Sequence, residues 1–147
     1  MTTTPTLNGQ ILGEAERATA ALLERLLAGT GTTFYEWVAL NQTTLSGGSI
    51  DHDDLVATMV SGLKIDQATV REAVADLLSS GLLDVWQDNG STVTLTDAGR
   101  ARHQRIRAAI GEITGRLYAG LPAADLVTAG RILTTLTARA NAELARA

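Results

Sequence analysis

The sequence predicts a mainly α-helical fold that carries one small β-hairpin. Most of the chain places apolar residues at the three- and four-residue spacing of amphipathic helices. Residues 82–95 differ, because strand-forming residues there flank an Asn-Gly turn signal. At 147 residues and 45% hydrophobic composition, the chain is long enough for one compact domain with further helices. The expected order is helix, helix, helix, helix, hairpin, helix, helix.

Charge and cysteine usage limit the possible functions. Lys and Arg number 12 against 16 Asp and Glu, so the net charge of −4 repels polyanions and nucleic-acid binding would need local basic patches. The absence of cysteine excludes disulfides, thiolate metal sites and thiol redox sensing. The first residues do not resemble a signal peptide, and no apolar stretch approaches the roughly 20 residues of a membrane span. We therefore expect a cytoplasmic protein with no membrane contact.

The first two helices are separated by glycines. Apolar spacing predicts a helix over residues 11–27, which Gly29 would end. Thr33 and Glu36 then match the capping-box pattern, which predicts a second helix to about residue 41. Phe34 and Trp37 are expected in the core of this helix.

The next two helices are predicted from their acidic N-terminal residues. After a loop at residues 46–49, Asp51 and Asp54 suit the positive end of a third helix that runs to about residue 61. Carboxylates next to His52 would also suit a metal ion, but four adjacent residues cannot all face one ion, so capping is favoured. Asp66 caps a fourth helix that ends before Gly81. Its inward stripe is Val70, Val74, Leu77 and Leu78.

The hairpin and the last two helices complete the chain. Residues 82–86 and 91–95 are predicted strands, in which Trp86 is expected to pack. Thr96 would cap a fifth helix that ends at Gly120, and Pro122 suits the first turn of a final helix that extends close to Ala147. The apolar faces of the terminal helices exceed what a small lobe needs, so we expect them to pair in a two-fold homodimer. The alternative is that they fold back on one monomer.

A polar-faced helix over residues 66–80 followed at once by a hairpin is the geometry with which winged-helix proteins read duplex DNA. The Thr69-Val70 pair, Gly81-Leu82, the hairpin and the run from Leu95 to Arg100 together resemble the multiple-antibiotic-resistance regulator (MarR) family of transcription factors. The resemblance implies a winged helix-turn-helix lobe at residues 32–96, with dimerisation helices at 10–28 and 97–147. It also implies a homodimeric repressor on a pseudo-palindromic operator, with a small-molecule pocket between the dimerisation helices and the lobe.

Carried over onto this sequence, the resemblance places the fourth helix in the major groove of DNA. Gln67, Thr69 and Arg71 would contact bases or phosphates there, since Arg pairs with guanine and Gln with adenine. The wing would contribute Asn89. The remaining expected contacts are with the DNA backbone, from Lys64 and from a helical face that Arg100 shares with His103 and Arg107, although such a face is often only solvated.

The chain departs from the family pattern at several of these places. Glu72 and Asp76 stand where the family usually has basic residues, and the hairpin carries no Arg or Lys. Because phosphate neutralisation supplies most nonspecific affinity, we expect weak, salt-sensitive binding or a site read mainly by the helix. The alternative is a winged-helix protein with weak or lost DNA binding that acts as a dimeric ligand-binding or protein-interaction module.

The expected ligand site lies between the second and fifth helices. Tyr35 and His103 would line an apolar pocket that suits a small aromatic or amphipathic effector. The alternative for Tyr35 is an ordinary surface position. His103 has no Ser or Asp partners that could form a catalytic set, so no enzyme activity, metal or cofactor is predicted.

Overall fold

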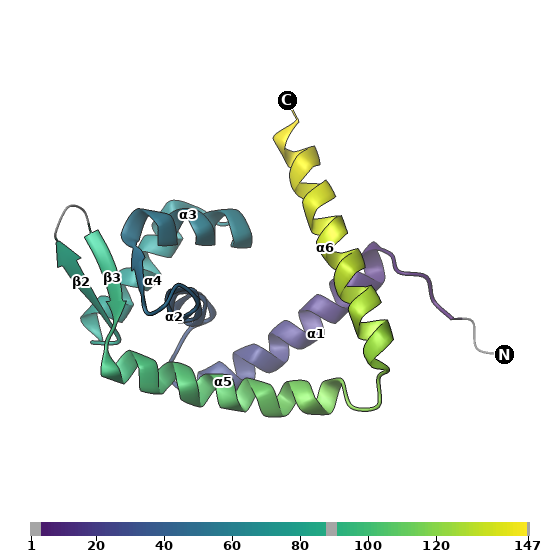
Figure 1. Cartoon of the computed structure of the whole chain (residues 1–147), viewed down its shortest axis with the longest axis horizontal. Helices are drawn as coiled ribbons and strands as arrows, with labels where there is room; N and C mark the ends of the chain where they lie inside the picture. The colour runs from purple at the N-terminus through teal and green to yellow at the C-terminus, as the bar shows by residue number, and fades with distance from the viewer. Residues whose placement is uncertain (1–3, 88–90, 147) are drawn as a thin grey trace. The chain divides into compact units, whose positions relative to one another are not determined.

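The computed structural model describes residues 4–87 and 91–146. This part forms helices and a small sheet in the order α1 (Gly9–Ala28), α2 (Phe34–Leu45), β1 (Ser49–Asp51), α3 (His52–Leu63), α4 (Gln67–Ser79), β2 (Leu83–Gln87), β3 (Ser91–Leu95), α5 (Asp97–Leu117) and α6 (Ala123–Ala145) (Figure 1). The predicted fold class, mainly α with a small hairpin, is confirmed. The chain divides into one compact unit up to Gly111 and another from Glu112 onward, so the boundary falls within α5.

The predicted helix starts are confirmed by their caps. Thr33 and Glu36 form the capping box at α2, where each side chain accepts a hydrogen bond from the other residue's backbone N–H. The carboxylate of Asp51 accepts from the backbone N–H of Asp54 at 3.0 Å and begins α3. Asp51 therefore caps a helix, as expected. The described residues contain no group of three or more His, Asp or Glu that could hold a metal ion.

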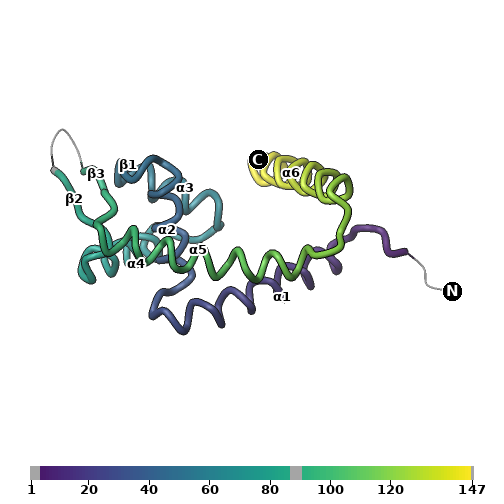
Figure 2. The backbone as a smooth tube through the Cα atoms, turned by 60° about the horizontal axis from the view of Figure 1, so that its bottom comes forward, coloured from purple at the N-terminus to yellow at the C-terminus, as the bar shows by residue number. Residues whose placement is uncertain are grey.

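The sheet has one more strand than the sequence predicted. Its order is β1-β3-β2, with β1 and β2 both antiparallel to β3 (Figure 2). The predicted loop at residues 46–49 therefore extends one residue too far, because Ser49 already pairs with Thr94. The turn before it needs glycine, since Gly47 and Gly48 have φ values of 88° and 98°. A strand of only three residues is too short to show the alternation by which strands are predicted.

The main core of the first unit lies between α2, α3, α4 and the sheet. It contains Ala39, Leu40, Leu55, Val56, Met59, Val70, Val74, Leu77, Leu82, Leu83, Val93 and Leu95. A smaller cluster joins Leu27 of α1, Trp37 of α2 and Ile106 of α5. These two clusters hold the elements of this unit in place.

Two aromatic residues are more exposed than predicted: Phe34, which was expected in the core, and Trp86, which was expected to pack within its strand. Phe34 is 36% exposed at the first turn of α2, where its ring meets the edge of Tyr35 at 5.7 Å between centroids. Trp86 is 62% exposed. Strand alternation explains Trp86, because Leu83 at the start of the same strand faces the core and residues an odd number of positions away face the other side.

The helix α6 of the second unit has no buried residue. Its large apolar side chains are between 37% and 71% exposed: Leu126, Val127, Ile132, Leu133, Leu136 and Leu144. No helix within residues 4–87 and 91–146 is long and apolar enough to cross a lipid bilayer.

Candidate nucleic-acid interface

Helix α4 buries one side and presents polar residues on the other. Val70, Val74 and Leu77 are at most 1% exposed and fix the orientation of the helix. Gln67 and Arg71 are exposed on its first two turns, and Thr69 is half-buried between them. The predicted base-contacting residues therefore lie at the N-terminal end of α4, where exposed side chains can reach a bound nucleic acid.

The start of α4 is held by Asp66. Its carboxylate accepts a hydrogen bond from the backbone N–H of Thr69 at 2.7 Å. This bond and a further one from the Thr69 side chain hold the pKa of Asp66 below its ordinary value, against the opposing effect of desolvation. The cap thus places a fixed negative charge beside the surface expected to meet DNA.

The acidic residues of α4 are also on its surface. Glu72 and Asp76 are both exposed. Among the described residues of the hairpin, 83–87 and 91–95, there is no Arg or Lys. Asn89, the predicted wing contact, lies outside the described residues. The helix surface carries both signs of charge, so attraction to a phosphate backbone depends on Arg71 and on cations from neighbouring segments.

Lys64 lies in the connection between α3 and α4. It is the C-cap of α3 in the left-handed conformation, with φ 57° and ψ 44°, and its ammonium donates to the carbonyl of Ser61. The residue is exposed. A left-handed non-glycine residue is uncommon, and here it makes the sharp change of direction between the two helices.

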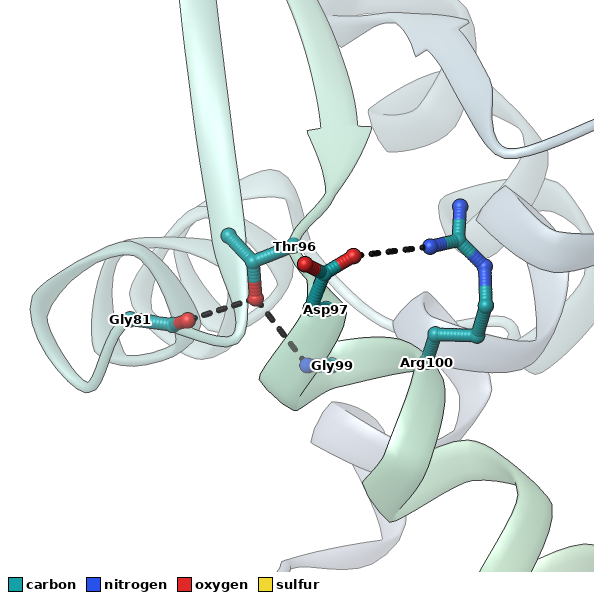
Figure 3. Close-up of polar contacts among 5 residues, drawn as sticks. All are labelled: Gly81, Thr96, Asp97, Gly99 and Arg100. Atoms are coloured by element: carbon teal, nitrogen blue, oxygen red, sulfur yellow. Dashed lines mark hydrogen bonds and ion pairs between the residues drawn. The ribbon is translucent and has the colours of Figure 1, made fainter.

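The start of α5 is tied to the end of α4 by Thr96 (Figure 3). Its hydroxyl donates to the carbonyl of Gly81 at 2.6 Å and accepts from the backbone N–H of Gly99 at 3.0 Å. Gly99 itself fits closely, since a Cβ built there would overlap the carbonyl oxygen of Leu82. One hydroxyl therefore caps α5, as predicted, and also ties it to the turn after α4, which was not predicted.

Arg100 lies one turn further along α5. Its guanidinium forms an ion pair with the exposed carboxylate of Asp97 at 3.3 Å, and its side chain is 53% exposed. It also lines a cavity of about 380 Å³, together with Thr44, Gly47, Gly48, Leu95, His103 and Gln104. Arg100 is thus available to a ligand or to a phosphate from solvent.

His103 does not lie on a solvated face with Arg100 and Arg107, which corrects that expectation. The imidazole is 9% exposed, stacks on Trp37 at 5.0 Å between centroids and forms a 3.0 Å hydrogen bond with the Asn41 side chain. Burial, and secondarily the charge of Arg107, lowers its pKa. The histidine is buried because its neighbours on α2 cover it, whereas Arg107 remains exposed.

Only one of the two predicted ligand residues lines the cavity described above. His103 is among the residues that line the 380 Å³ cavity, and Tyr35 is not. Tyr35 is half-buried and packs against the main core, so it is not the ordinary surface residue of the alternative interpretation. A ligand role for this pair stays a prediction.

Sequence reasoning missed Arg102. Its guanidinium donates to the hydroxyl of Thr32 at 2.8 Å, and Thr32 is only 5% exposed. The contact ties α5 to the loop between α1 and α2. A run of arginines and polar residues in one helix gives no signal for which member turns inward, so this position was not predictable.

Solved structures share the fold of this chain. No protein-family model matches the chain, and no curated protein matches it. A regulator from Silicibacter pomeroyi has a TM-score of 0.76 at 18% identity, over 89% of this chain and 87% of that one. Oxidised MarR from E. coli has a TM-score of 0.69 at 20% identity, over 90% and 96% of the two chains. The chain has the MarR-family fold.

A third structure of the MarR fold carries information about a ligand. BpsR of Bordetella bronchiseptica has a TM-score of 0.70 at 26% identity, over 91% of this chain and 99% of that one. The DNA binding of BpsR is regulated by 6-hydroxynicotinic acid. The Silicibacter pomeroyi protein is described as a MarR-family transcriptional regulator.

Proposed function

We propose that this chain is a DNA-binding transcriptional regulator that acts in the cytoplasm as a homodimeric repressor on a pseudo-palindromic operator. The observation that carries the proposal is the surface of α4, where Gln67 and Arg71 are exposed at the N-terminal end while the opposite side is buried. In a dimer, two such helices enter successive major grooves about 34 Å apart. Lys64 and Arg100 contact phosphates beside each helix, and Asn89 is a further DNA contact of the proposal.

The homodimer is supported by the apolar surface of the terminal helices. In α6 the large apolar side chains are at least 37% exposed, and Leu12 of α1 is 40% exposed. Apolar area of this extent is stabilised by burial against another surface. A second copy of the chain supplies that surface, because a two-fold interface uses the same helices from both partners.

Regulation by a small molecule is the second part of the proposal. The cavity that contains Arg100, His103 and Gln104 is of a size that admits a small molecule. The fold is shared with BpsR, whose DNA binding responds to 6-hydroxynicotinic acid. An aromatic or amphipathic effector would act by binding more tightly to a dimer whose α4 helices have the wrong separation for DNA.

The deciding experiment is a fluorescence-anisotropy titration of the chain against the promoter DNA next to its own coding region, at low and at moderate salt. Specific binding is expected to exceed binding to a random duplex in both buffers. Arg71→Ala should weaken the specific complex by about 1–3 kcal/mol if the guanidinium reads a base. Arg105→Ala is the matched control, because it removes the same charge from an exposed position on α5.

The results of these titrations distinguish base reading by Arg71 from a response to overall charge. An unchanged affinity of Arg71→Ala would reject base reading by that residue. Equal losses in the two variants would mean that only overall charge is sensed. Affinity for the promoter no tighter than for the random duplex in either buffer would contradict the regulator proposal for that site.

A second candidate function is a winged-helix module with weak or lost DNA binding that binds ligands or proteins. The observation that favours it is the charge of the candidate interface, where Glu72 and Asp76 are exposed on α4. No Arg or Lys occurs between Leu82 and Thr96 in the sequence. Replacement of both acidic residues, Glu72→Gln with Asp76→Asn, distinguishes the candidates. A regulator has a measurable nonspecific affinity for DNA before the change and gains affinity after it. A module without DNA binding has no measurable affinity before the change.

A further inference from the structure

A tryptophan is exposed on the outer side of the small sheet. Trp86 of β2 is 62% exposed, whereas Trp37, the other tryptophan of the chain, is 6% exposed. Tryptophan is enriched at the centres of protein interfaces, since its large rigid ring buries much area and loses little conformational freedom. The exposure of Trp86 therefore indicates that a binding partner covers this side chain.

The strand register identifies the neighbours of Trp86. Trp86 is opposite Thr92 and Asp84 is opposite Thr94 in the pairing of β2 with β3. In the pairing of β1 with β3, Asp51 is opposite Thr92 and Ser49 is opposite Thr94. Because side chains alternate between the two sides of a sheet, these residues share the side that faces away from buried Leu83 and Val93. We call this set the outer sheet face: Ser49, Asp51, Asp84, Trp86, Thr92 and Thr94.

The outer sheet face is negatively charged. Its ionisable members are Asp51 and Asp84, both exposed, and it contains no cation. One oxygen of Asp84 accepts from the backbone N–H of Val85 at 3.1 Å, which holds the carboxylate at the strand. The face of an indole ring is itself electron-rich. All of these groups attract a cation, and the carboxylates repel a phosphate backbone.

We propose that the outer sheet face docks a protein segment that carries arginine. The guanidinium lies over the ring of Trp86, within about 6 Å of its centroid, and donates to the carboxylate of Asp84. The two residues are separated by one position on the same strand, a distance of roughly 7 Å, so a guanidinium between them can contact both. Arginine is preferred over lysine because its planar group stacks on an aromatic ring and binds a carboxylate through two parallel hydrogen bonds. The inference goes beyond the proposed DNA-binding function and does not depend on it.

The test uses the full chain labelled with nitrogen-15 and follows the two tryptophan indole N–H signals by NMR. The probe is a short amidated peptide that contains two arginines separated by one residue, and the matched probe replaces both arginines by citrulline, which is neutral and nearly isosteric. The Trp86 signal is expected to shift and saturate with the arginine peptide, and to shift at least about fivefold less with the citrulline peptide at equal concentration. The Trp37 signal serves as the internal control, since that ring is buried.

Variants separate the two parts of the contact. Asp84→Asn should weaken peptide binding about threefold, in the range of an exposed ion pair. Glu24→Gln removes the same charge from an exposed position on α1 and should leave the titration unchanged. In Trp86→Phe, binding is followed by the backbone N–H signals of β2 and should weaken without being lost. An unshifted Trp37 signal in each variant verifies that the fold is intact.

Three results would overturn the proposal. Equal shifts with the arginine and citrulline peptides would show that charge is not recognised. Equal shifts of Trp37 and Trp86 would indicate nonspecific binding. A larger Trp86 shift with a random DNA duplex than with the arginine peptide would assign the outer sheet face to nucleic acid. Loss of promoter binding in Arg71→Ala with an unchanged peptide titration would affect only the function proposed for α4.

Discussion

Gly99 shows how closely α5 approaches the segment before the hairpin. A Cβ at this position would overlap the carbonyl oxygen of Leu82 and lie 3.2 Å from Cδ2 of Leu95. Backbone atoms cannot move aside as a flexible side chain can. We expect Gly99→Ala to lower the free energy of unfolding by at least about 1–3 kcal/mol, the usual range for overpacking, as measured by urea denaturation followed by circular dichroism.

Gly111 on the same helix is the matched control. A Cβ built there meets nothing within 4 Å. Gly111→Ala should therefore stabilise the protein by about 0.5–1 kcal/mol through helix propensity alone. A similar change in stability for the two variants would contradict the close approach at Gly99.

The buried imidazole of His103 makes stability depend on pH. Burial lowers the pKa of His103 in the folded state, so the unfolded chain takes up the proton at a higher pH than the folded protein does. The free energy of unfolding should thus be constant above the unfolded pKa of about 6.5, fall as the pH drops through it, and level off below the folded pKa. Urea denaturation between pH 8 and pH 5 measures this dependence.

Replacement of each histidine isolates the effect. His103→Gln removes the titrating group and should flatten the pH profile, although it also lowers stability at every pH through loss of the stacking on Trp37. His52→Gln, at the start of α3, should leave the His103 part of the profile in place. If the slope between pH 7 and pH 5 is the same in His103→Gln as in the parent protein, another group causes it.

The roles of residues that contact near neighbours in the sequence were predictable, and the roles of residues that contact distant parts of the chain were not. The caps at Thr33, Asp51 and Asp66 depend on contacts within a few residues, which the sequence displays directly. The burial of His103 depends on residues of α2 that lie far away in the sequence. A polar residue spaced regularly between arginines therefore appears solvent-facing until the packing of α2 on α5 is known.

Among the elements, the turn after α4 is joined to the start of α5 by the hydroxyl of Thr96, beside a backbone hydrogen bond from Thr96 to Leu82. Thr96→Val keeps the shape of the side chain but removes both hydrogen bonds, to Gly81 and from Gly99. We expect a loss of about 0.5–2 kcal/mol in the free energy of unfolding, the range for a helix cap. Thr96→Ser retains the hydroxyl and should lose less. Equal losses in chemical denaturation would attribute the effect to packing of the methyl group and not to the cap.

The helices were easier to predict than the sheet. Each helix of the first unit shows apolar periodicity and a cap or a terminal glycine, so its existence and type follow from local sequence. The strand β1 has three residues and follows two glycines, and it is defined only by its pairing with β3. For the same reason the side of β2 that meets the core was not predictable, and Trp86, which was expected to pack, is exposed.

At the scale of the whole molecule, the exposed apolar side chains of α6 predict self-association. Leu136→Glu places a charge next to Leu133 and Ile132, and should convert the proposed dimer to a species of the 15.4 kDa chain mass. Size-exclusion chromatography with light scattering measures the mass. Ala138→Glu is the control, because it lies on the opposite side of α6 by helical spacing. A parent protein that is monomeric at all concentrations would contradict the proposed homodimer.

The hydroxyl of Thr96 has a mechanical consequence. Its two hydrogen bonds join Gly81, in the turn after α4, to the first turn of α5 (Figure 3). We therefore expect a tilt of the first turns of α5 to be transmitted to the end of α4 through these hydrogen bonds. Such a movement can change the direction of the exposed side chains of α4 while every hydrogen bond inside that helix stays intact.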